Sequence, residues 1–214
     1  MPISSRDKQL LKLAVPALGA LLAEPLYVLA DTAVVGHLGT SALGGLGVSS
    51  SALMLIYGLC FFLAYGTTAT IARLMGAKKN KEAANQIVQS IWLAVFTGVF
   101  LGAIVFLFSS QLLGAMGATG DLLTQARIYL RISMYGAPAM LIMLAGVGYL
   151  RGVKDTVRPL WVSIGTAVLN LVIELVLIYG LDLGIGASAA ATVIAQWVGA
   201  FIYLVWIGKE IRIY

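Results

Sequence analysis

Long apolar stretches dominate this chain and restrict the folds open to it. Mainly hydrophobic runs of about 20 residues or more recur six times, and about 20 helical residues cross a hydrocarbon core of about 30 Å. Only 11% of the residues are charged, whereas soluble domains carry roughly 25%. We therefore predict an all-α membrane protein that forms a single transmembrane domain over residues 1–214. The six predicted helices cover residues 10–36, 44–72, 85–109, 122–149, 159–180 and 184–207.

The basic residues fall on alternate connections between these predicted helices. Twelve of the fourteen Lys and Arg residues lie near the two termini, after the second helix or after the fourth helix, and the other three loops contain none. By the positive-inside rule, both termini and the basic loops are cytoplasmic. We therefore expect a multi-pass protein of the inner (plasma) membrane whose net charge of +5 reflects orientation rather than contact with nucleic acid.

The sequence offers little support for an enzyme. Cys60 is the only cysteine, so no intrachain disulfide or multi-thiolate metal site can form. The glycines do not form a nucleotide-binding loop that opens onto a lysine, and we find neither a nucleophile elbow nor a cluster of metal ligands. We predict no catalytic residues and no cofactor, so any work that the protein performs must draw on an ion gradient.

Two acids in the first predicted helix are the strongest functional signal. Glu24 and Asp31 lie seven residues apart, which returns them to nearly the same helix face. An ionisable side chain at depth in a bilayer is costly and usually faces a bundle interior or a water-filled cavity. Pro16 and Pro25 interrupt the same helix, and each predicts either a packing kink or a bend that moves during function.

The fifth and sixth predicted helices carry a second polar group. Asn170 and Glu174 are four residues apart and share a face, as do Thr192 and Gln196. An amide beside a carboxylate can supply oxygen ligands to a cation or stabilise a proton, although such side chains also hydrogen-bond between helices as structural contacts. The acids of the first helix favour the functional interpretation.

Two arginines stand apart from the basic loops. Arg127 and Arg131 lie one turn apart near the outer end of the fourth predicted helix. They either extend to the outer headgroups or face a cavity.

Several segments together resemble one transporter family. These are DTAVVGHLGT at the end of the first helix, ARLMGAKKNKEA, YLRGVKDTVRP, the Asn170 and Glu174 pair, and GASAAATVIAQW in the sixth helix. Their order and spacing are similar to the amino-terminal six-helix lobe of multidrug and toxic compound extrusion (MATE) transporters of the MOP superfamily, and most similar to the DinF-type branch.

The resemblance implies an antiporter that uses protons or sodium ions to export amphipathic, often cationic compounds by alternating access. It places the proton or cation site, including any bound Na⁺, at Asp31, Asn170, Glu174 and Thr192, with Tyr129 beside it. Glu24 and Gln196 are weaker candidates for lining the same cavity.

The chain departs from the family in two respects. Glu174 stands where many members have aspartate, which leaves the choice between protons and sodium open. Family members also have two six-helix lobes, so we expect a half-length chain that is a fragment, one part of a split protein, or a lobe that pairs with itself. The alternatives are a flippase for lipids or lipid-linked precursors with the same fold, and a membrane lobe that binds a cation without transporting anything.

Overall fold

The protein is a bundle of long helices. The computed structural model describes residues 5–181 and 183–212, but not the side chains of residues 5–10, 12, 13, 17, 20, 23, 24 and 27. No strand occurs in these ranges, which confirms the predicted all-α class. In chain order the elements are α1 (Ser5–Gly36), α2 (Thr40–Leu59), α3 (Phe62–Gly76), α4 (Asn80–Ala115), α5 (Gly120–Ser133), the 3-10 turn η1 (Met134–Gly136), α6 (Ala137–Gly152), α7 (Val157–Leu175), the π-helical segment η2 (Val176–Gly180) and α8 (Ile185–Ile211).

Most of these helices are suited to crossing a membrane. Within the part of the chain that the structure describes, five segments are long and apolar enough to do so. They are Thr40–Gly76, Asn80–Ala115, Gly120–Gly152, Val157–Gly180 and Ile185–Ile211. Helix α1 is a further helix of 32 residues that runs without interruption through Pro16 and Pro25. Movement at these two prolines stays a prediction.

Two of the predicted single helices are composite. The predicted helix 44–72 is α2 followed by α3, and at their junction the Cys60 N–H donates to the carbonyl of Tyr57, 2.9 Å away, in a tightened turn. The predicted helix 122–149 is α5, η1 and α6. Here Pro138 sits in the first turn of α6, and because it has no N–H it cannot continue the α-helical ladder from η1.

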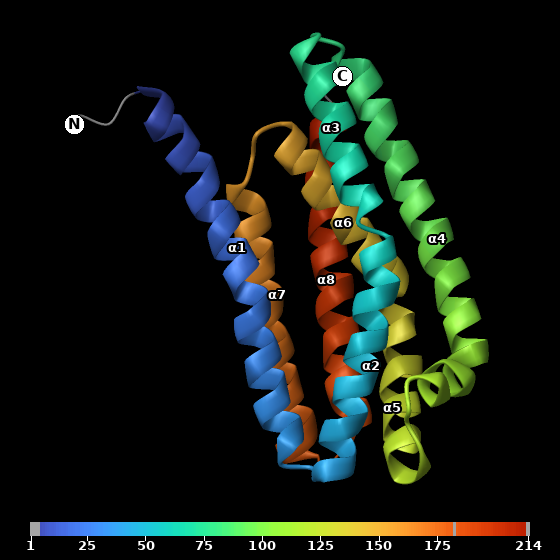
Figure 1. Ribbon diagram of the computed structural model, residues 1–214. Coiled ribbons are helices and arrows are strands. Elements are labelled where there is room, and N and C mark those ends of the chain that lie inside the picture. The colour runs from blue at the N-terminus through green and yellow to red at the C-terminus, as the bar shows by residue number, and fades with distance from the viewer. Residues whose placement is uncertain (1–4, 182, 213–214) are drawn as a thin grey trace.

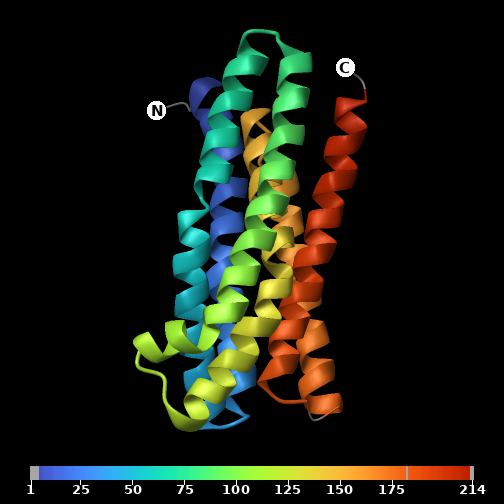
Figure 2. The same cartoon turned by 90° about the vertical axis from the view of Figure 1, so that its right-hand side faces the viewer.

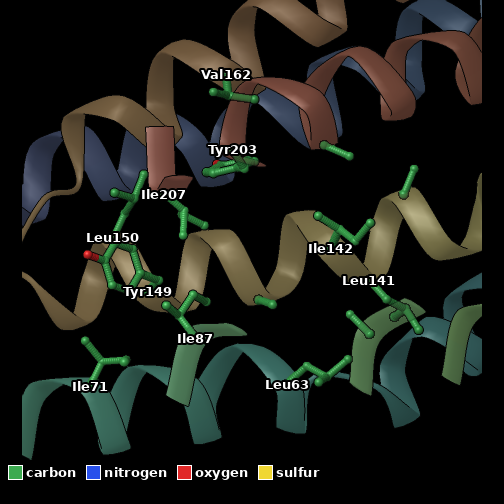
Figure 3. Packing of buried hydrophobic residues seen from close by; sticks show 14 of the residues in the cluster. Leu63, Ile71, Ile87, Leu141, Ile142, Tyr149, Leu150, Val162, Tyr203 and Ile207 are labelled. Atoms are coloured by element: carbon green, nitrogen blue, oxygen red, sulfur yellow. The ribbon is translucent and has the colours of Figure 1, made fainter. Parts of the chain in front are cut away.

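Helix α6 lies at the centre of the largest cluster of buried apolar residues, which also includes residues of α3, α4 and α8. Figure 3 shows its side chains Leu141, Ile142, Tyr149 and Leu150 between the residues of α3 on one side and Tyr203 of α8 on the other. Glycines bring the backbones close, since an added Cβ at Gly148 would lie 2.6 Å from the carbonyl oxygen of Ala64 in α3. Such close contact of small residues favours helix association where lipid removes the hydrophobic driving force.

The two ends of the lobe differ in character. Figures 1 and 2 show the first turn of α1, the α3–α4 turn and the last turn of α8 at one end, and the α1–α2 turn at the other. The end with the first turn of α1 carries the basic turns, in which Lys78 and Lys154 both adopt positive φ. This arrangement agrees with the predicted segregation of basic residues, while the side of the membrane that they face stays a prediction.

Candidate functional site

A pair of buried carboxylates lies where α1, α7 and α8 meet. Asp31 is 5% exposed and Glu174 has no accessible surface. Their carboxyl groups lie beside each other, and both lie next to the buried hydroxyl of Ser188. All three residues lie within about two turns of the end of the lobe opposite to the basic turns. The site therefore lies near the outer side in the predicted orientation.

Hydrogen-bond donors are scarce at this pair. The Ser188 hydroxyl donates its single hydrogen to Oδ1 of Asp31 at 2.6 Å. Neither oxygen of Glu174 has a donor among the described residues, and two ionised carboxylates cannot hydrogen-bond to each other because both only accept. The described residues also place no Lys, Arg or His in an ion pair with either acid. The pair therefore needs a proton or a cation to be stable in this position.

Asn170 and Thr192 extend the polar site by one helical turn. The Thr192 hydroxyl donates to the carbonyl of Ser188 at 3.1 Å, so it can only accept from the Asn170 amide, whose Nδ2 lies 2.9 Å away. This arrangement leaves Oδ1 of Asn170 buried with no donor from the part of the chain that the structure describes. The four residues predicted to form the site are thus connected through Ser188.

The oxygen atoms of this site suit a hard monovalent cation or a proton. It consists of two carboxylates and an amide oxygen, and hard cations prefer oxygen ligands. The spacing of the sequence produces this concentration, because Asn170 and Glu174 share one face of α7 while Ser188 and Thr192 share one face of α8. The π-helical segment η2 begins directly after α7, and such segments are frequent at functional sites.

The weaker candidates lie in different places. Tyr129 of α5 is buried in an apolar cluster with Val34 and Val35, the turn of α1 that follows Asp31. Gln196 lies against Gly136 of η1, and its Oε1 is buried without a donor among the described residues. The side chain of Glu24 lies outside the described residues, so its predicted place in the cavity stays a prediction.

Ser188 is the site residue that sequence reasoning missed. It stands within the small residues of the segment GASAAA, a composition typical of a helix-packing surface. Its signal was its position one helical turn before Thr192, on the same face of α8.

Comparison with known proteins supports one family. Residues 16–176 match the family model described as MatE. DNA damage-inducible protein F of Escherichia coli (strain K12) is 33% identical over 212 residues, which cover 99% of this chain and 46% of that protein. The probable multidrug resistance protein NorM of Thermotoga maritima is 31% identical, over 96% of this chain and 46% of that protein.

A solved structure of a MATE protein in a bent conformation is similar throughout the lobe. Its TM-score is 0.88 at 30% sequence identity, and the match covers 95% of this chain and 45% of that one. The chain thus spans about half the length of the relatives that it matches.

Proposed function

Because this chain belongs to the MATE family of multidrug and toxic compound extrusion transporters, we propose that it is the ion-coupled lobe of an antiporter. In this proposal, protons or sodium ions bind at Asp31, Glu174, Asn170 and Thr192, and their passage drives the export of amphipathic, cationic compounds. The names of the relatives support the substrate class, since one is called a multidrug resistance protein.

The buried carboxylate pair is the observation that carries this proposal. Ser188 donates to Asp31 and neither oxygen of Glu174 has a donor among the described residues, so the pair without a bound ion carries two like charges in a site with little solvent. A bound proton or sodium ion removes this repulsion and lets α1 pack closely against α7 and α8. Loss of the ion favours separation of α1 from these helices. Ion occupancy is thereby coupled to the packing of α1, which is what alternating access requires.

We further propose that a second six-helix lobe completes the transport pathway. The matched relatives are about twice as long as this chain. The second lobe could be another part of the same polypeptide, a separate chain or a second copy of this lobe.

Neutralising Asp31 tests the proposed coupling. The transporter with its second lobe, reconstituted in proteoliposomes, should export ethidium when a proton or sodium gradient is imposed. Asp31→Asn should abolish this gradient-driven export while leaving the protein folded. Glu210→Gln, which changes an acid paired with Arg158 at the basic end, is the matched control and should keep most of the activity.

Each part of the proposal has its own refutation. Full export by Asp31→Asn would disprove the coupling role of this carboxylate. If the lobe alone, shown to be monomeric, moved ethidium against its gradient, the requirement for a second lobe would be wrong. A lobe that only binds a cation would retain ²²Na⁺ and move no ethidium under either gradient, which would refute transport itself.

A further inference from the structure

A groove on the surface of the lobe has features that the proposed antiport does not use. It runs between α4 and the η1 region, and its volume is about 460 Å³, within the range of roughly 300–1,000 Å³ typical of small-molecule sites. Its residues include Gly98, Gly102 and Phe106 of α4, together with Arg131, Tyr135 and Pro138.

Close approach of the two backbones shapes the groove. An added Cβ at Gly98 would lie 2.5 Å from Cα of Pro138, and one at Gly102 would lie 3.3 Å from the carbonyl oxygen of Met134. The glycines therefore form a floor without side chains. The Phe106 and Tyr135 rings lie 6.3 Å apart in an edge-to-face arrangement, and together they form a wall.

Arg131 supplies the only charge among the residues that line the groove. Its Nε donates to the hydroxyl of Ser109 at 2.9 Å, and its guanidinium carbon lies 4.8 Å from the centre of the Phe106 ring. Within the described ranges Arg131 forms no ion pair. The Ser109 contact uses one of the five guanidinium N–H groups and leaves the two terminal nitrogens to bind an anion.

The surroundings of the groove indicate where that anion comes from. The neighbouring surface of α4 is strongly apolar, since Phe96, Phe100 and Leu107 are each about two-thirds exposed. Such a surface on a membrane helix faces acyl chains. An arginine there is costly unless its charge is compensated or reaches the interface, and guanidinium binds phosphate groups through paired, charge-assisted hydrogen bonds.

We propose that this groove binds one anionic phospholipid. The phosphate accepts hydrogen bonds from the terminal guanidinium nitrogens of Arg131, which Ser109 and Phe106 hold in place. One acyl chain lies over Gly98 and Gly102, along exposed Ala103. The groove is formed by other elements than the carboxylate pair on α1, α7 and α8, so this inference does not depend on the proposed antiport.

Lipid retention tests the proposal directly. The delipidated transporter in detergent is mixed with equal amounts of phosphatidylglycerol and phosphatidylcholine of the same acyl composition, and bound lipid is counted by native mass spectrometry. The wild-type protein should retain phosphatidylglycerol selectively. Arg131→Gln should reduce this selectivity about tenfold or more, the change expected for loss of a charge-assisted contact.

Three further variants make the test specific. Arg127→Gln removes the exposed arginine one turn away and should leave selectivity unchanged. Arg131→Lys keeps the charge without the planar donor pair and should retain part of the selectivity. Ala103→Trp fills the groove from an exposed position and should lower retention of both lipids at this site.

Several results would overturn the assignment. These are equal retention of the two lipids by the wild type, unchanged selectivity in Arg131→Gln, and unchanged retention in Ala103→Trp. Displacement of the lipid by an equal concentration of glycerol 3-phosphate would show that the site recognises phosphate alone. Circular dichroism melting of each variant confirms that losses do not come from unfolding.

Discussion

Replacing Glu174 by glutamine should make the lobe more stable, although it removes a side chain from the proposed ion site. Among the described residues, both Glu174 oxygens are buried without a donor, and they lie beside Asp31. The glutamine amide can donate to Asp31, and a hydrogen bond to a charged group contributes about 1.5–3 kcal/mol. In the pair without a shared proton or a bound cation, removing the like charge also relieves a repulsion whose upper limit is about 4 kcal/mol at 4 Å and an effective dielectric constant of 20.

We expect a net gain of about 2 kcal/mol, since the amide still loses part of its hydration. For a protein of this size, 1 kcal/mol shifts the melting midpoint by about 2–4 °C, so Glu174→Gln should melt about 4–8 °C above the wild type. The midpoint is measured by circular dichroism in detergent over a series of pH values, in choline rather than sodium salts, because the gain is expected where the wild-type pair shares no proton. Adding sodium should raise the midpoint of the wild type if sodium binds, and should change the variant far less.

The matched control variant is expected to lose a little stability rather than gain it. Glu210 is paired with Arg158 in a partly exposed ion pair, so Glu210→Gln should lower stability by no more than about 1 kcal/mol. A midpoint for Glu174→Gln equal to or below that of the wild type would show that the Glu174 oxygens are satisfied in the folded protein. The stabilisation expected for Glu174→Gln, which depends on these oxygens having no donor, would then be wrong.

Two further predictions concern the scaffold. Gly98→Ala forces its new methyl group against the backbone of Pro138 and should lower the free energy of unfolding by about 1–3 kcal/mol. Gly114→Ala in the same helix meets open space and should raise the free energy of unfolding by up to about 1 kcal/mol. Thermal melts that rank the two variants in the reverse order would contradict the packing of α4 against α6. Asp155 accepts hydrogen bonds from the backbone N–H groups of Val157 and Arg158 at 3.0 and 3.1 Å. Asp155→Ala should therefore lower the free energy of unfolding by about 0.5–2 kcal/mol, while Asp155→Asn should keep most of the stability. Equal losses of stability in the two variants would rule out capping of α7 by this side chain.

The position of the site was predictable because its members break the apolar pattern. Asp31 and Glu174 are ionisable groups within long hydrophobic helices, where a charge needs a partner or a cavity. Helical spacing placed Asn170 beside Glu174, and resemblance to a family placed Thr192 with them. Ser188 was missed because a serine costs little in an apolar helix and resembles the alanines around it.

The interruptions of the helices were harder to predict. Nothing in the hydropathy of residues 44–72 distinguishes Cys60 and Phe61, where α2 ends and α3 begins, because this break changes backbone geometry without adding polar residues. Pro138 offered a local reason for the second break, but proline also occurs inside α1 at Pro16 and Pro25 without ending that helix. Whether proline breaks a helix depends on tertiary contacts, which a single sequence does not reveal.

The two interruptions adjoin each other in space. Tyr57, just before the first break, packs both with the cluster that contains Met134 and Ala137 and with the one that contains Leu63 and Leu141. At Cys60–Phe61 and at η1 the α-helical ladder is already replaced by tighter turns, and helices bend most readily where that ladder is interrupted. The bending stiffness of the lobe is therefore uneven. We expect a bend of the α2–α3 span or of the α5–α6 span to concentrate at this seam, whereas α4 and α8 are single continuous helices.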